Sequence, residues 1–251
     1  LMESESPHAR AIEEHYQPRY PGDQLPQSIL GQVLSLADKL DTIVGCFGIG
    51  AIPTGSEDPY ALRRQGLGII QILSEKPFDN PVTLMEVTDQ AIAGYQKESG
   101  IALKPETSSE VVSFLKQRID FYLHSEKIRY DIINAVLARD SIATGGMTGN
   151  IVKLAKALAD FSGEELFRPL ITCYKRAARI LPEKFEGNLD RSFLTTGADL
   201  VLYDTLLDLD EKVDAQIEKQ AFGHALRSLS DLYHPLDRFF PQQGQVADRG
   251  G

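Results

Sequence analysis

The chain has 251 residues, of which 42% are hydrophobic and 25% charged, and its net charge is −10. This length suits one large domain or two smaller ones, and the ordinary apolar content excludes a disordered chain as the default. An acidic chain is also a poor non-specific nucleic-acid binder, because phosphate attraction needs local cations.

The cysteines and the first residues of the chain indicate the cellular compartment of the protein. Cys46 and Cys173 are the two cysteines, too few for a zinc motif or a disulfide framework. No run of 18 apolar residues is present, and the first residues lack a basic stretch followed by an apolar one. We therefore expect a cytoplasmic protein without a membrane partner. The abrupt start suggests a truncated chain.

Apolar residues recur at helical spacing along most of the chain, and no strand alternation is evident. The sequence therefore predicts an all-α protein. A first helix ends near residue 17. Ser28 is expected to cap a helix from Ile29 to Gly45, and the glycines that follow predict a loop.

The next helix is expected to begin at Asp58-Pro59, with Asp58 as the cap and Pro59 as its first residue. Gly66 and Gly68 inside it each cost roughly 1 kcal/mol of helix propensity, which indicates close packing against another backbone. Thr107 or Ser108 is expected to cap a later helix. Further helices are predicted over residues 82–97, 107–139, 151–160, 164–180, 194–209 and 213–232.

Charge is unevenly distributed. Residues 1–106 hold 15 acids and 8 bases, and residues 183–251 hold 13 acids and 7 bases, whereas residues 111–182 hold 7 acids and 11 bases. The change of sign coincides with a connector at residues 100–107, which predicts a domain boundary there.

Asp38 and Asp41 lie three residues apart on a predicted helix, so they can share one face. Such a pair can bind a metal, receive an arginine or be solvated surface. A hydrolytic metal centre needs about three protein ligands, so we expect an ion pair with Lys39, Arg63 or Arg64 that fixes the turn between two helices.

Arg63 and Arg64 are adjacent, so their side chains project about 100° apart on a helix and cannot serve one contact. Each can bind a phosphate or a carboxylate. An ion pair within the chain and a contact with RNA are equally supported for them.

The basic block offers further candidates for phosphate contact, and Tyr122, Tyr130 and Tyr174 lie among them as possible stacking rings. Solvated helix faces with buried tyrosines are the alternative. The candidates are Lys116, Arg118, Lys127, Arg129, Arg139, Lys175, Arg176 and Arg179.

Two resemblances can be stated. Residues 11–22 and 36–41 resemble the later half of an HD-type domain, in which His15 and Asp38 occupy metal-ligand positions. The earlier His and the His-Asp pair of active members are absent from the chain. The resemblance therefore implies a vestigial centre that binds no metal.

The second resemblance covers nearly the whole chain. Several separated segments, in the same order, resemble the bacterial glycyl-tRNA synthetase β subunit, in which an HD-like module precedes an anticodon-binding-type helical domain. The segments are 11–19, 36–42, 47–50, 53–55, 58–64, 118–120, 130–137 and 175–180.

This resemblance implies a domain organisation. Residues 1–100 would hold the C-terminal half of the HD-like module with connecting helices, and residues 107–240 a truncated helical-bundle domain of the anticodon-binding type. Residues 241–251 are polar and helix-breaking, and are expected to be a tail foreign to the family.

The resemblance also implies a role in a two-subunit glycine–tRNA ligase. The chain would position tRNA(Gly) for the α subunit, which carries out the ATP-dependent aminoacylation, and would itself supply no catalytic residue and bind no cofactor. DNA is not an expected partner. The alternatives are a metal-dependent phosphohydrolase of HD type and a purely structural module that holds subunits together.

Overall fold

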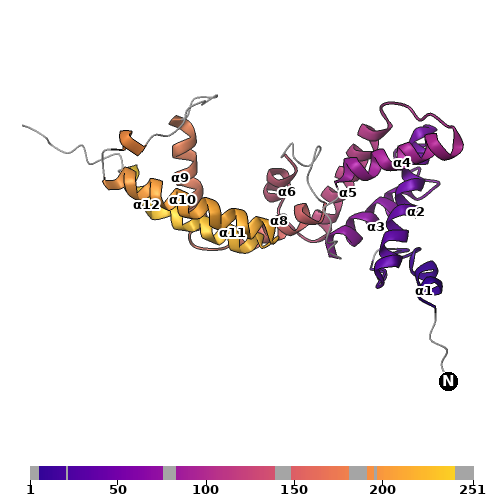
Figure 1. Ribbon diagram of the computed structural model, residues 1–251, viewed down its shortest axis with the longest axis horizontal. Helices are drawn as coiled ribbons and strands as arrows, with labels where there is room; N and C mark the ends of the chain where they lie inside the picture. The colour runs from indigo at the N-terminus through magenta and orange to yellow at the C-terminus, as the bar shows by residue number, and fades with distance from the viewer. Residues whose placement is uncertain are drawn as a thin grey trace, which may run out of the picture. The chain divides into compact units, whose positions relative to one another are not determined.

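The computed structural model describes residues 6–20, 22–75, 83–138, 148–180, 191–194 and 197–240, and these ranges are mainly helical (Figure 1). Their only β structure is an isolated bridge between Thr54 and Glu57, which confirms the all-α class. Within these ranges no helix is long and apolar enough to cross a membrane. The chain divides into two compact units, Leu1–Ala155 and Lys156–Gly251.

Three mutually packed helices form the centre of the first unit: α2 (Ile29–Gly48), α3 (Leu62–Glu75) and α5 (Thr107–Ser125). Apolar side chains from all three are fully buried, as Ile43, Ile70 and Leu115 illustrate. Four more helices belong wholly or partly to this unit: α1 (Pro7–Glu14) and α4 (Leu84–Ser99), which both pack on α2, α6 (Tyr130–Leu137), which packs on α5, and the first part of α8 (Thr148–Phe161).

Two predicted helix starts can be judged by the side chains that cap them. Ser28 accepts a hydrogen bond from the Gly31 amide at 3.0 Å, as expected, but α2 continues three residues past its predicted end to Gly48. Asp58 accepts from the amides of Leu62 and Arg63. The helix nevertheless begins at Leu62 and not at Pro59, because Ala61 has a φ of 54°, which an α-helix excludes.

The prediction that Thr107 or Ser108 caps α5 is wrong. Thr107 is the first helical residue, and its buried hydroxyl has no hydrogen-bond partner among the described residues. Ser108 donates instead to Asp89 of α4 at 2.7 Å. The previous helix has the cap that its sequence favours, since Thr83 and Glu86 form a reciprocal capping box at the start of α4.

The α3 glycines are closely packed, as predicted, but against side chains and not against another backbone. A Cβ on Gly66 would lie 3.0 Å from both Phe114 and Arg118 of α5, and a Cβ on Gly68 would lie 3.2 Å from Lys39 of α2. Both distances are shorter than ordinary carbon contacts. The glycines therefore let α3 approach two neighbours more closely than any side chain would allow.

The second unit consists of a long helix and a broken one that returns along it. The long helix is α10 (Gly197–Glu218), and α11 (Phe222–Ser228), η2 (Leu229–Leu232) and α12 (Tyr233–Phe239) all pack against it. α9 (Phe167–Ile180) packs on η2 and α12, and a short turn, η1 (Arg191–Phe193), precedes α10.

The continuous helix predicted over 213–232 is therefore wrong. Residues 213–218 end α10, Gln220 turns the chain with a φ of 55°, and a new helix starts at Phe222. The buried residues of this unit include Phe161, Cys173 and Leu209.

The connector at residues 100–107 does not separate the compact units. It lies inside the first unit, where α5 packs against α2, α3 and α4, and the division falls at 155/156. The basic block of residues 111–182 is consequently shared between the units. The assignment of residues 1–100 and 107–240 to particular domain types stays a prediction, and residues 241–251 lie outside the described ranges.

Candidate nucleic-acid interface

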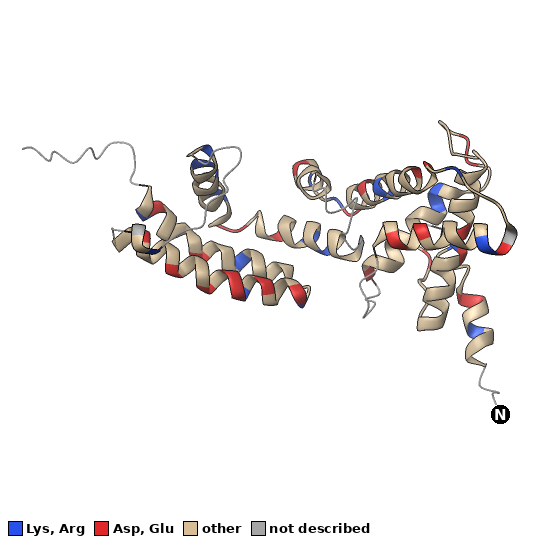
Figure 2. Ribbon diagram, turned by 45° about the horizontal axis from the view of Figure 1, so that its top comes forward, with Lys and Arg blue, Asp and Glu red and all other residues tan. Residues whose placement is uncertain are grey.

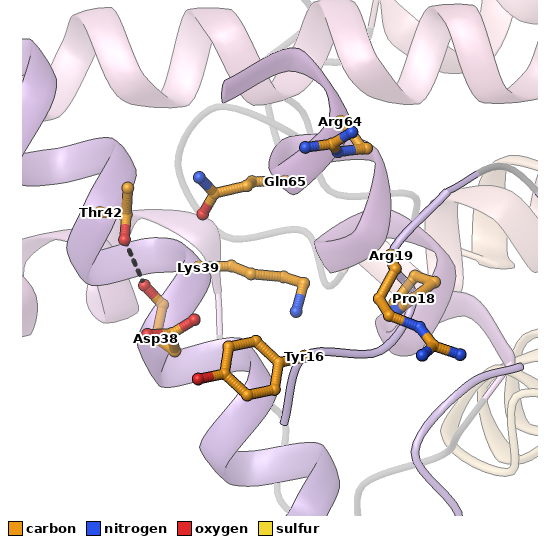
Figure 3. Close-up of a pocket in the computed structure, with 8 residues that line it drawn as sticks. All are labelled: Tyr16, Pro18, Arg19, Asp38, Lys39, Thr42, Arg64 and Gln65. Atoms are coloured by element: carbon orange, nitrogen blue, oxygen red, sulfur yellow. Dashed lines mark hydrogen bonds between the residues drawn. The ribbon is translucent and has the colours of Figure 1, made fainter. Parts of the chain in front are cut away.

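A hollow of about 310 Å³ opens beside the link between α1 and α2 and the start of α3 (Figure 3). Its wall combines cationic, polar and aromatic side chains from those three segments. It contains the predicted positions Asp38 and Arg64. The lining residues are Tyr16, Pro18, Arg19, Asp38, Lys39, Thr42, Arg64 and Gln65.

Lys39 holds this region together. Its side chain is buried, and its Nζ donates to the carbonyls of His15 and Gln17, each at 3.0 Å, and to Ser35 Oγ at 2.8 Å. An ammonium has three donors, so these contacts use all of them. Burial lowers the pKa of Lys39 to about 8, and the nearby Asp38 carboxylate partly opposes that shift.

The expected role of Asp38 and Asp41 is therefore wrong. Asp38 is exposed, and Asp41 accepts hydrogen bonds from the Tyr95 hydroxyl through Oδ2 at 3.1 Å and through its carbonyl at 3.0 Å. In the described part of the chain, neither carboxylate forms an ion pair with Lys39, Arg63 or Arg64. The helix junction is fixed instead by the Lys39 ammonium and by the Asp58 cap.

The vestigial pair His15 and Asp38 does not gather further ligands. The His15 Nδ1 contacts the Ile12 carbonyl within its own helix turn. Across the described ranges, no group of three or more His, Cys, Asp and Glu side chains is placed to hold a metal ion.

Arg63 and Arg64 point in different directions, as their adjacency predicts. The Arg63 guanidinium donates weakly to the Glu57 carbonyl at 3.5 Å. Arg64 is exposed and lines the hollow. Of the two, Arg64 is the better placed to meet an anion from solvent.

Arg118 lies against the protein and not toward solvent. Its guanidinium carbon is 5.4 Å from the centre of the Phe114 ring and 6.0 Å from that of Phe121. Burial and the neighbouring Arg63 lower its pKa. Tyr122 is also buried, which raises its pKa to about 12, so its ring is part of the core and cannot stack on a base.

The turn between α5 and α6 exposes three of the predicted residues. Lys127 and Tyr130 are exposed, Tyr130 to 70%. Arg129 is exposed too, but its Nε and Nη2 donate to the two carboxylate oxygens of Asp131 at 3.1 and 2.6 Å. Lys116 is half-buried on α5, and Arg139 lies outside the described residues.

α9 separates the three bases that the sequence placed together. Lys175 and Arg179 are exposed. Arg176 faces α12, where its Nη2 donates to the Phe240 carbonyl at 2.7 Å, its guanidinium lies 5.2 Å from the centre of the Phe240 ring, and its Nη1 is 3.9 Å from Asp237. Arg176 is therefore a packing residue of the second unit.

Arg168 was not among the candidates predicted from the sequence. It is exposed near the start of α9. Its separation of 7 and 11 residues from Lys175 and Arg179 places all three on one face of a helix. That spacing is the signal that could have identified it.

These features define a helical protein with separate groups of exposed basic side chains on an otherwise acidic chain. Residues 2–138 match the family described as glycyl-tRNA synthetase beta subunit. Because the match covers more than half of the chain, the chain belongs to this family.

Individual relatives extend the similarity beyond the family match. The chain is 36% identical over 241 residues to the glycine–tRNA ligase beta subunit of Syntrophus aciditrophicus, covering 96% of this chain and 34% of that protein. It is 38% identical over 246 residues to the protein of the same name from Desulforamulus reducens, with the same coverage. The chain thus spans about a third of the length of these relatives.

Proposed function

We propose that this chain is the tRNA-binding portion of the β subunit of a two-subunit glycine–tRNA ligase, and that it positions tRNA(Gly) for aminoacylation by the α subunit. Family membership carries the proposal, since residues 2–138 match the β-subunit family and similarity to named β subunits extends over 96% of the chain. The α subunit is proposed as a partner because the relatives are named as beta subunits.

The surface chemistry supports an RNA ligand. The net charge of −10 gives the chain little general attraction for a polyanion. Contact must therefore come from local cations that the protein does not neutralise itself. Arg64, Lys127, Lys175 and Arg179 are exposed and have no ion pair among the described residues. Arg118, Arg129 and Arg176 are engaged within the protein.

The proposal assigns no chemical step to this chain. ATP would be used by the whole ligase, and the cytoplasm, where protein synthesis takes place, would be its location. The exposed cations would bind and orient the RNA, because charged donors held on helices can fix phosphates but supply no nucleophile. The part played by this chain would then be a contribution to tRNA affinity and placement.

The test is binding of tRNA(Gly) by the 251-residue chain at several salt concentrations. Phosphate contacts release counterions, so the dissociation constant should rise on the order of tenfold or more between about 50 and about 200 mM KCl. An unrelated tRNA of equal length measures the sequence-independent share of the affinity. Absence of binding at the lowest salt concentration would contradict the proposal for this chain.

A further inference from the structure

Three exposed bases form one stripe along α9. At 100° per residue, Arg168, Thr172, Lys175 and Arg179 lie within an arc of about 60° on the helix surface, and all four are exposed. Along the axis, the first two cations are about 10 Å apart and the last two about 6 Å apart. The stripe is therefore a linear array of positive charge, and the Thr172 hydroxyl within it donates to the Arg168 carbonyl at 3.0 Å.

Two of the acids close to α9 in the second unit are occupied elsewhere, whereas Glu165, three residues before Arg168, is exposed. α9 itself contains no acidic residue. Glu164, one turn before Arg168, pairs with Arg227 of α11 at 2.7 Å, and Asp237 of α12 lies beside Arg176. Among the described residues, the three cations of the stripe consequently have no ion-pair partner, and their charge is available to a ligand.

The rest of the second unit has the opposite charge. α10 carries one lysine, Lys212, and that lysine pairs with Asp231. Figure 2 shows basic residues on α9 and acidic residues along α10. A polyanion is repelled by α10 and attracted by α9, so the stripe directs where it can bind. The acids of α10 are Asp199, Asp204, Asp208, Asp210, Glu211, Asp214 and Glu218.

An aromatic ring lies on the helix face next to the stripe. Tyr174 is 66% exposed and lies about 100° around α9 from Lys175 and about 120° and 140° from Arg168 and Arg179. A strand that contacts the stripe must therefore bend around the helix to reach the ring. An exposed ring beside spaced cations is the combination that binds single strands, because the cations follow the backbone while the ring stacks on a base. An acidic peptide would use the cations but has no need of the ring.

We propose that Arg168, Lys175 and Arg179 contact the phosphates of a single-stranded RNA segment and that Tyr174 stacks on one of its bases. The inference rests on the proposed function and names the part of the chain that would hold an unpaired segment of tRNA(Gly). It adds Arg168 and Tyr174 to the interface and removes Arg176 from it.

The test compares two variants of the full chain with the parent. The triple variant Arg168→Gln, Lys175→Gln, Arg179→Gln should raise the dissociation constant for tRNA(Gly) on the order of tenfold or more, and should reduce the slope of log K against log salt by about 2. Tyr174→Leu should weaken binding about fivefold or more and leave the salt slope unchanged.

The controls separate charge from folding. Lys219→Gln removes an exposed lysine next to the acidic α10 and should change neither affinity nor slope. Glu165→Gln removes the exposed acid three residues before Arg168 and should strengthen binding. Thermal unfolding followed by circular dichroism should be the same for the variants and the parent, because every altered side chain is exposed.

Each remaining outcome decides between the claims. If the parent binds tRNA(Gly) and the triple variant keeps both its affinity and its salt slope, the α9 cations do not contact the RNA. The proposed function is then unaffected. If the parent does not bind, both are wrong. If the triple variant loses affinity for phosphatidylserine vesicles while its tRNA binding is unchanged, the stripe serves a lipid surface and the RNA inference is overturned.

Discussion

Lys39 shows where reasoning from single residues failed. An ion pair was expected for Asp38, with solvated surface as an alternative, and in the structure Asp38 is exposed. The sequence could not show that the charged neighbour at position 39 is buried, because a lysine is normally exposed. Its burial depends on two carbonyls of the preceding link, those of His15 and Gln17, and on a hydroxyl of its own helix. These oxygens come together only in the folded chain.

Replacing this lysine should lower the stability of the protein. In Lys39→Met the three oxygens lose their donor, and a buried acceptor without a partner is costly. The free energy of unfolding at about pH 7.5, measured by urea denaturation, should fall by roughly 2 to 3 kcal/mol. Asp38→Asn is the matched control and should change it by less than about 0.5 kcal/mol, because Asp38 is exposed. Equal stability of Lys39→Met and the parent would contradict the role.

The same lysine should give the parent a distinct pH dependence. The pKa of Lys39 is about 8 in the folded chain, against an ordinary value of 10.5, so between these pH values the unfolded state binds more protons. Stability therefore rises with pH in that window. Relative to Lys39→Met, the free energy of unfolding of the parent should increase by about 2 kcal/mol from about pH 7.5 to about pH 9.5. A constant difference between the two proteins would show that Lys39 does not titrate there.

At the scale of elements, the helices could be predicted but several of their ends could not. The apolar period and the Ser28 cap placed the start of α2 correctly. The errors lie at Ala61, Lys127 and Gln220, non-glycine residues with positive φ that turn the chain just before α3, α6 and α11. Lys127 lies in the break that divides the helix predicted over 107–139 into α5 and α6. In a sequence, glycine is the residue that predicts such a turn, because other residues seldom adopt a positive φ. Packing, not local preference, imposes it here.

Two helical glycines should respond in opposite directions to alanine. Gly66→Ala places a methyl group 3.0 Å from Phe114 and Arg118, and the strain should outweigh the propensity gain, lowering the free energy of unfolding by about 1 kcal/mol. A methyl group added at Gly94 of α4 would meet no atom within 4 Å, so Gly94→Ala should raise it by about 0.5 to 1 kcal/mol. Chemical denaturation of both variants is the measurement. A stabilising Gly66→Ala would show that α3 and α5 do not pack closely.

At the scale of the whole molecule, the sequence predicted a basic block but not its division. Residues 111–182 are contiguous in sequence, yet they belong to two compact units that separate at 155/156. Contacts distant in sequence decide which of their side chains face solvent. Arg118 is covered because Gly66 of α3 leaves room for it, and Arg176 is engaged because the chain returns to it at Phe240. From helical spacing alone, Arg118 and Arg176 were candidate RNA contacts just as Lys175 and Arg179 were.

The contact between Arg176 and Phe240 should stabilise the second unit and leave the first unaffected. Arg176→Leu removes a hydrogen bond to a carbonyl, a cation–ring contact and a weak ion pair with Asp237, which together are worth about 1 to 2 kcal/mol. Because the chain forms two compact units, the loss should be confined to residues 156–240. Hydrogen exchange should show faster exchange of α12 amides and unchanged exchange in α2 and α5. Lys175→Leu, which alters an exposed neighbour, should leave both regions unchanged. Equal acceleration in α2 and α12 would mean that the two units unfold as one.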